Sequence, residues 1–208
     1  MTTKSTPSPS PRRKPKGDKR ERTRAKLLEA ARQLVREKGY EDTTLESVAK
    51  RAGMTTGAIY GNFKNRDELF VALGHAYWPA IKPKVKAGAS LAAIMHAMAN
   101  ATIAVLPDRK AAAVGRLTGV AYTLRHEDLL AQVRAVTAQS YAMGAEWLCT
   151  MIDEDELPMP AEQMVRVIHA LSEGLVLQTL LTEDLFPKSI FYSAFEALAS
   201  APKRAKKK

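Results

Sequence analysis

The 208-residue chain is long enough for one or two domains with a sizeable core, and its single cysteine, Cys149, excludes an internal disulfide. The net charge is +10, but it is concentrated at the ends. Residues 1–24 hold nine basic and two acidic residues, residues 201–208 hold five basic and no acidic residue, and the body between is nearly neutral. This pattern predicts a cytoplasmic protein with two basic tails that can bind polyanions, and Cys149 is expected to be a small core residue.

Residues 1–19 combine proline, serine and lysine and contain no apolar segment. We expect a disordered arm rather than a secretory signal. Its basic side chains can follow DNA phosphates or reach the minor groove, which adds affinity and little specificity. The expected DNA-contacting residues of the arm are Arg12, Arg13, Lys14, Lys16, Lys19 and Arg20. Residues 202–208 are expected to be a solvated basic tail.

Residues 20–66 are predicted to form a helix-turn-helix unit. An apolar helical stripe over residues 27–35 ends at Gly39, a residue suited to a left-handed C-cap. A short second helix stops at Gly53, and Thr55 can cap a third helix that reaches residue 62. Two short helices joined by a glycine turn can present the second helix to the DNA major groove.

The remaining helices are predicted from capping residues. Capping-box spacings, Thr43 with Glu46 and Asn65 with Glu68, precede the second and fourth helices. Later helices are expected to start at Ser90, Asp108, Asp128 and Pro160, to end near residues 106, 125, 153 and 185, and to be followed by a last one that ends near residue 200. The fold class is therefore all-α with about nine helices: a small N-terminal unit and a larger bundle over residues 67–201. Residues 87–107 lack charges, but a buried helix is a better interpretation than a membrane span.

Two stretches carry a specific motif: A-x-x-L-V-x-E-K-G-Y-x-x-T-T-L over residues 31–45 and V-A-x-R-A-G-M-T-T-G-A-I-Y-x-N-F-K-N-R-x-E-L over residues 48–69. In this part the chain resembles the tetracycline-repressor (TetR, or AcrR-like) family of bacterial transcription regulators. The resemblance implies a homodimer that binds a palindromic operator in double-stranded DNA. It also implies a small-molecule effector that releases the operator.

The same resemblance implies which residues contact DNA. Phosphates are expected at Thr44, Tyr60, Lys64 and Arg66. The N-terminus of the third helix, with Thr55, Thr56 and Gly57, favours an anion through its backbone N–H groups. Thr56, Ala58 and Asn62 are left to face base edges, and Asn62 can pair with adenine. Gly61 stands where the family usually has a bulky residue, which puts that base contact in doubt.

The residue inventory argues against an enzyme. The four histidines, His75, His96, His126 and His169, have no metal-type spacing, and no phosphate-binding or nucleophile motif is present. The acidic residues 153–156 point in different directions around a helix end and are expected in a solvated loop. We therefore expect no catalytic residue, no metal and no cofactor.

The C-terminal bundle is expected to bind an apolar or aromatic effector. The candidate pocket residues are aromatic or polar: Trp78, His96, Asn100, Tyr122, Tyr141, Trp147 and His169. Taken singly, each is more often a packing residue. His96 and Asn100 lie four apart on an otherwise apolar helix and could equally face a pocket or form a structural hydrogen bond.

Two apolar helices at the C-terminus suggest a dimer interface. The candidate interface residues are Leu171, Gly174, Leu175, Gln178, Phe191 and Phe195. Packing within one chain would explain the same pattern, and the sequence does not separate the two. The predicted function is a ligand-responsive repressor. The alternatives are an activator, a regulator without ligand, or a non-specific, basic-tailed architectural DNA-binding protein.

Overall fold

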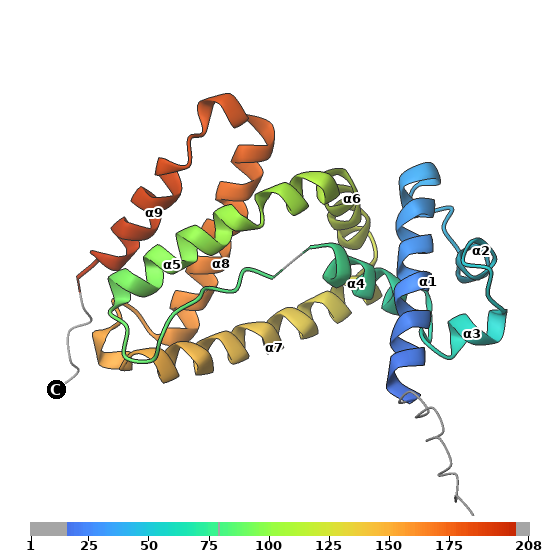
Figure 1. Cartoon of the computed structure of the whole chain (residues 1–208), viewed down its shortest axis with the longest axis horizontal. Helices are drawn as coiled ribbons and strands as arrows, with labels where there is room; N and C mark the ends of the chain where they lie inside the picture. The colour runs from blue at the N-terminus through green and yellow to red at the C-terminus, as the bar shows by residue number, and fades with distance from the viewer. Residues whose placement is uncertain (1–15, 79, 203–208) are drawn as a thin grey trace, which may run out of the picture. The chain divides into compact units, whose positions relative to one another are not determined.

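The computed structural model describes residues 16–78 and 80–202, and this part of the chain is helical and without strands (Figure 1). It contains nine α-helices and two short 3₁₀ turns. The all-α class and the expected number of helices are therefore confirmed. The chain divides into two compact units, residues 1–66 and 67–208, and each is described by itself.

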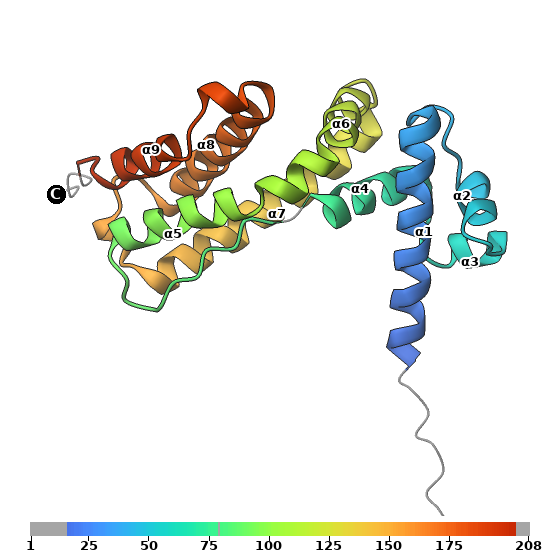
Figure 2. The same cartoon turned by 45° about the horizontal axis from the view of Figure 1, so that its top comes forward.

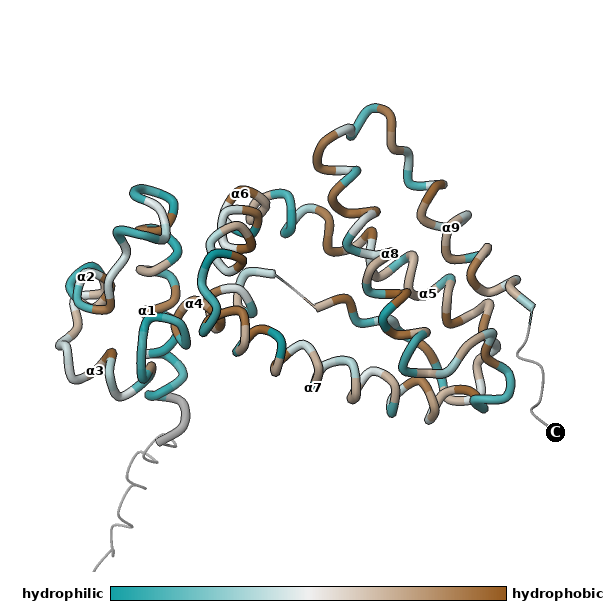
Figure 3. Tube along the Cα trace, turned by 180° about the vertical axis from the view of Figure 1, so that it is seen from behind, coloured by the Kyte–Doolittle hydropathy of each residue, from teal (hydrophilic) through white to brown (hydrophobic). Residues whose placement is uncertain are grey.

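The first unit consists of three helices: α1 (Lys16–Lys38), α2 (Leu45–Arg51) and α3 (Thr56–Tyr60). Its core is formed by buried apolar side chains from all three helices and the connecting turns. They include Leu27, Ala31, Leu34, Tyr40, Leu45, Val48, Ala49, Ile59 and Phe63. Hydrophilic residues line much of the rest of α1 (Figure 3). The left-handed backbone at Gly39 (φ 84°) ends α1, and the same conformation at Gly53 (φ 64°) makes the turn between α2 and α3.

Helix α1 begins earlier than expected. Its first residue is Lys16, so the arm predicted over residues 1–19 is wrong in its last four positions. Gly17 and Asp18 are poor helix formers, but residues 19–26, which follow them, are mostly lysine, arginine, glutamate and alanine, which favour a helix. Lys16, Lys19 and Arg20 therefore belong to a helix. The other predicted arm residues (Arg12, Arg13 and Lys14) and residues 203–208 of the basic tail lie outside the described residues.

Capping was predicted correctly at two helices and wrongly at two others. Thr55 caps α3 and Ser90 caps α5 (Leu91–Ala104), as expected. The cap of α2 is Thr44 instead of Thr43: Thr44 Oγ1 accepts from Ser47 N at 3.1 Å, and Ser47 Oγ accepts from Thr44 N at 3.1 Å. Thr43 is buried and its hydroxyl donates to the Gly39 carbonyl at 2.7 Å, so it stabilises the preceding turn.

The second wrong cap concerns the junction of α5 with α6 (Leu106–Leu124). Helix α5 ends at Ala104, and a bend of 63° separates it from α6. Pro107 lies in the first turn of α6, where a missing N–H costs no hydrogen bond. Asp108 is therefore already inside the helix and does not cap it.

The second unit is a helical bundle. Besides α5 and α6 it contains α4 (Arg66–Tyr77), α7 (Glu127–Met151), α8 (Ala161–Leu181) and α9 (Ser189–Ala199), and two 3₁₀ turns, η1 (Glu154–Glu156) and η2 (Glu183–Leu185). The first residue of α4, Arg66, still belongs to the first unit. Helix α5 packs along α9, and α7 packs along α8 (Figures 1 and 2). The core between them consists of fully buried apolar side chains: Ile94, Met95, Leu148, Leu157, Met164, Phe191 and Phe195.

In the described part of the chain, α8 alone is long and apolar enough to span a membrane as a single helix. Helices α5 and α6 pass the same test as a bent pair. One face of α8, with Met164, Ile168 and Leu175, is buried in the bundle, as in the core helix of many proteins. Length and composition are therefore weak evidence for a membrane span here.

Gly144 of α7 packs closely against Val165 of α8. A Cβ at Gly144 would lie 2.9 Å from Val165 Cγ1, too close for two carbon atoms. Valine is stiff about χ1, so its methyl group cannot easily move aside. At Gly115 of α6, by contrast, a Cβ would meet no atom within 4 Å.

We predict opposite effects of alanine at these two glycines. Gly115→Ala should raise the free energy of unfolding by about 0.5–1 kcal/mol, because alanine favours a helix. Gly144→Ala should lower it by about 1–2 kcal/mol, because overpacking outweighs that gain. Urea unfolding followed by circular dichroism measures both. Equal stabilisation of the two variants would contradict the close packing of α7 on α8.

Candidate functional site

Helix α3 presents a short, exposed surface in the first unit. Its N-cap, Thr55, accepts a hydrogen bond from Ala58 N at 3.2 Å, and Ile59 is fully buried and anchors the helix to the core. Thr56, Gly57 and Tyr60 are exposed on the other side. A helix of five residues has little stability of its own, so its place depends on these anchors.

Arg24 of α1 holds the C-terminal end of α3. Its Nη1 donates to the Asn62 carbonyl at 2.9 Å, and its guanidinium lies 4.3 Å from the ring centroid of Phe63. Phe63 is itself buried. The hydrogen bond and the cation–π contact fix the chain directly after the helix.

The half-buried side chain of Asn62 bonds to the end of α3. Asn62 follows α3, and its Nδ2 donates to the Ala58 carbonyl at 2.8 Å. Its Oδ1 is buried and has no hydrogen-bond partner. The structure thus corrects the expected pairing with adenine: this amide ends the helix. Sequence spacing alone does not reveal this, because asparagine suits either role.

Arg66 is also engaged inside the first unit. Its Nη2 donates to the carbonyls of Tyr40 and, at 3.0 Å, Glu41, which closes the turn after α1. A guanidinium used in this way is a structural group, so the expected phosphate contact of Arg66 is replaced by a role in folding. A further ion pair joins α2 to α1: Arg51 Nη2 lies 2.6 Å from Glu37 Oε2, which lowers the pKa of the Glu37 carboxyl and raises the pKa of Arg51.

Tyr60 is exposed and hydrogen-bonded to an acid. Its hydroxyl donates to Glu46 Oε1 of α2 at 2.8 Å. This bond lowers the pKa of the Glu46 carboxyl and raises the pKa of Tyr60. Glu46, first expected to be part of a capping box, therefore bonds to the exposed side of α3 instead.

The seven predicted pocket residues do not gather in one place. His96 and Asn100 are exposed and both contact Tyr192 of α9: the rings of His96 and Tyr192 are 5.1 Å apart, and the Tyr192 hydroxyl donates to Asn100 Oδ1 at 2.7 Å. The structural hydrogen bond is thus the correct alternative for Asn100. Tyr141 and His169 form a separate pair across α7 and α8, joined by a hydrogen bond of 2.7 Å.

The other three predicted pocket residues pack inside the bundle. Tyr122 is buried and stacks on His126, with ring centroids 3.9 Å apart. Trp147 packs on the apolar core. Trp78 Nε1 donates to the carboxylate of Glu173 at 3.2 Å. Arg109, which is 3% exposed, forms an ion pair with the same carboxylate at 2.6 Å, and its guanidinium lies over the Trp78 ring.

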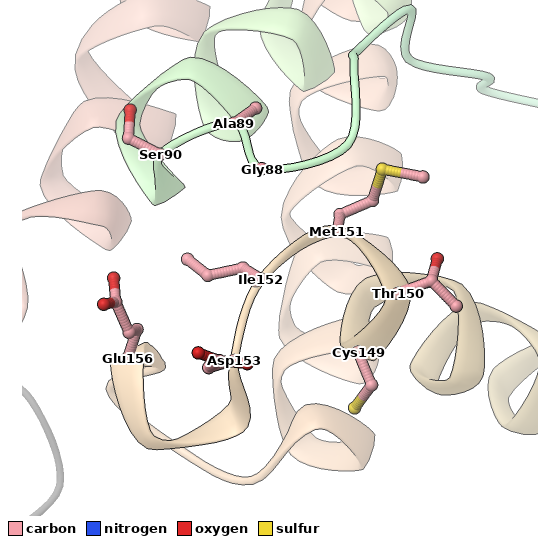
Figure 4. A pocket seen from close by; sticks show the side chains of 9 residues that line it. All are labelled: Gly88, Ala89, Ser90, Cys149, Thr150, Met151, Ile152, Asp153 and Glu156. Atoms are coloured by element: carbon pink, nitrogen blue, oxygen red, sulfur yellow. The ribbon is translucent and has the colours of Figure 1, made fainter.

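A hollow of about 500 Å³ lies elsewhere, where the end of α7 meets the start of α5 (Figure 4). Ile152 extends between Ser90 and Glu156, and Asp153 lies beside them. Cys149 also lines this hollow and is exposed, so its predicted place in the core is wrong. The buried face of α7 runs through Ala145 and Leu148, and Cys149 lies one position beyond it.

The predicted interface residues divide into two groups. Leu175, Phe191 and Phe195 are buried within the chain, which corrects their assignment to a dimer interface. Leu171 packs against the same core. Gly174 and Gln178 are exposed. Gly174 belongs to an exposed stripe of α8 that Gln178 flanks and that repeats at spacings of three and four residues: Val167, Ala170, Gly174, Leu177 and Leu181.

Residues 27–73 match the tetR family of bacterial regulatory proteins. One curated relative is the HTH-type transcriptional regulator TtgR of Pseudomonas putida, 47% identical over 51 residues. This alignment covers 24% of the present chain and 24% of TtgR, so the chain spans about a quarter of the length of this relative. The family is described as bacterial regulatory proteins, and the relative is a transcription regulator.

Solved structures extend the likeness of the fold to most of the chain. NalD, the secondary repressor of the MexAB-OprM multidrug efflux pump in Pseudomonas aeruginosa, has a TM-score of 0.55 and 21% identity, over 86% of the present chain and 95% of NalD. The multidrug binding protein EbrR, complexed with imidazole, has a TM-score of 0.58 and 21% identity, over 89% and 93% of the two chains. At these identities the likeness concerns the fold alone.

We predict that Arg66→Lys destabilises the first unit. Lysine keeps the charge but lacks the planar group that reaches both carbonyls, so the free energy of unfolding should fall by about 1–3 kcal/mol. Thermal unfolding measures the effect, and Arg36→Lys, at an exposed position of α1, is the control. If Arg66→Lys unfolds as the unaltered protein does, the side chain is free to contact phosphate as first predicted.

Proposed function

The chain carries the helix-turn-helix unit of the TetR family, and we propose that it is a DNA-binding transcription regulator, a repressor that binds a palindromic operator as a dimer. The observation that supports this most is the exposed N-terminal face of α3. Thr55 caps it, Ile59 and Arg24 hold it in place, and it lies within residues 27–73, which match the tetR family.

The proposed contacts with DNA are assigned to side chains that are exposed to solvent. Thr56 and the half-buried Ala58 offer methyl groups, and Thr56 also a hydroxyl, to base edges in the major groove. Thr44, Tyr60 and Lys64 are exposed beside them and bind phosphates. Thr55 and Gly57 contribute the start of the helix. Asn62 and Arg66 support this surface from within.

Selection of bound sequences from random duplex DNA tests the proposal. A repressor of this type should select a palindrome and protect it in a footprint, because two equal heads bind two half-sites. A non-specific architectural protein, which the basic tails also suit, would select no consensus. Transcription from a promoter that contains the selected site then separates a repressor from an activator.

We propose that the dimer forms through the exposed stripe of α8. Spacings of three and four residues place Val167, Gly174 and Leu181 on one face, with Ala170 and Leu177 between them. A Cβ at Gly174 would meet no atom within 4 Å, so a second helix can approach closely there. Val167 and Leu181 lie on either side of Gly174 along this face, so two antiparallel copies of α8 that cross at Gly174 would bring apolar residues together, as a two-fold interface requires.

We also propose that a small molecule releases the operator. The support is the likeness in fold to EbrR, which was solved with imidazole, and the hollow of about 500 Å³, whose size suits an ordinary ligand. An effector acts by preferring a protein state in which the two heads no longer fit adjacent major grooves. Because linkage is reciprocal, operator DNA must weaken effector binding by the same factor. Titration of the operator complex with apolar and aromatic compounds tests this response.

We predict that two substitutions near α3 act differently on DNA binding. Thr56→Ala should change the preferred base at one position of each half-site, because that side chain faces the bases. Lys64→Met should weaken all sequences alike and reduce the slope of log affinity against log salt by about 0.9. Repeated selection and salt titrations measure the two effects. An unchanged consensus with Thr56→Ala would contradict the proposed docking.

We predict that a charge at Leu177 dissociates the dimer. Leu177→Glu buries a carboxylate against its symmetry mate and should yield monomers that bind the operator far more weakly. Val114→Glu on α6 is the control, since Val114 is even more exposed (82% against 36%) and lies outside the proposed interface. Sedimentation measures both variants. Dissociation by Val114→Glu alone would move the interface to α6.

We predict that removal of residues 1–15 weakens binding to operator and random DNA by a similar factor. This deletion removes Arg12, Arg13 and Lys14 and leaves α1 intact. If all three bind phosphates, the slope of log affinity against log salt should flatten by about 2.7 units. The selected consensus should stay the same. Loss of an A·T-rich flank from the consensus would show that the arm instead reads the minor groove.

A further inference from the structure

Glu46 accepts a hydrogen bond from a residue to which the proposed function assigns a phosphate. The Tyr60 hydroxyl donates to Glu46 Oε1 at 2.8 Å, from α3 to α2. This hydrogen bond is the largest cause of the lowered pKa of Glu46. Glu46 is exposed, and 49% of Tyr60 is exposed, so the pair lies at the surface.

We propose that Glu46 is a positioning residue that takes the place of a phosphate oxygen at Tyr60 in the free protein and so limits affinity for DNA. This inference rests on the proposed function. A hydroxyl group has a single proton, so Tyr60 can donate to Glu46 or to a phosphate but not fully to both. Binding to DNA is therefore an exchange of one anion for another.

The charge of Glu46 adds to this effect. Its pKa lies below the ordinary value for glutamate, so the carboxylate is ionised at neutral pH. A phosphate that reaches Tyr60 comes close to this negative charge, and like charges repel. Phosphates are present in every sequence, so Glu46 lowers affinity for operator and random DNA alike. Meanwhile the hydrogen bond holds the Tyr60 ring over α2 before DNA arrives.

The test uses the full-length protein with Glu46→Gln, which keeps the size and one acceptor oxygen but removes the charge. We expect about two- to fivefold tighter binding to both operator and random duplex DNA, the range for one exposed charge interaction. Asp42→Asn is the matched control: it removes one exposed negative charge from the turn before α2. Equal tightening by Asp42→Asn would overturn the inference, because net charge alone would then explain the gain.

A second pair of variants examines the role of the hydroxyl. In a Tyr60→Phe background, Glu46→Gln should tighten binding by a smaller factor than in the unaltered protein, since no Tyr60 hydroxyl remains to be released and only the repulsion of phosphate by the charge is removed. An unchanged gain in that background, or weaker binding with Glu46→Gln alone, overturns the inference. Thermal unfolding confirms that each variant is folded. If the unaltered protein binds no DNA, the proposed function itself fails; if it binds DNA and Glu46→Gln has no effect, only the inference about Glu46 fails.

Discussion

The shortness of α2 and α3 is the constraint on which the DNA-binding unit depends. Helices of seven and five residues are not stable by themselves, so their positions must be fixed by other groups. Buried Ile59 and Phe63 supply the apolar part. Arginine side chains supply the polar part, since Arg24 and Arg66 donate to backbone carbonyls of turns that no helix satisfies. These contacts fix α3 from its buried side, so its opposite face stays exposed to solvent.

Hydrogen bonds within the first unit also determine which polar side chains can contact DNA. Asn62 and Arg66 have the chemistry to contact DNA, but Asn62 Nδ2 and Arg66 Nη2 donate to carbonyls of their own unit. Thr56 lies exposed on the open side of α3. Tyr60 is intermediate, because its hydroxyl bonds to an exposed carboxylate that another anion can displace. Burial and hydrogen-bond partners thus divide neighbouring polar residues into supporting and contacting groups.

Local signals in the sequence predicted the fold well and the sites less well. Thr55, Ser90 and Gly39 were assigned correctly because caps and left-handed turns are determined within a few residues. The predicted cap of α2, Thr43, was wrong by one position because Thr44 also has a hydroxyl group. Which of the two threonines is buried depends on packing against the core. Phe191 and Phe195 were placed at an interface because an apolar stripe does not tell whether α5 or a second chain covers it. The pocket residues are far apart in sequence, so their separation in space could only come from the tertiary structure.

Gly57 leaves one position on the exposed side of α3 without a side chain. Its backbone is right-handed, and a Cβ there would touch only Thr55 Oγ1 at 3.9 Å. Glycine is thus not required at this position by geometry. Larger residues can be added where the surface now has no side chain, without removing an existing contact or disturbing Ile59 beneath it. New recognition of DNA sequences can therefore be built onto this scaffold by addition, which makes the bare position a natural starting point for regulators that work side by side without cross-talk.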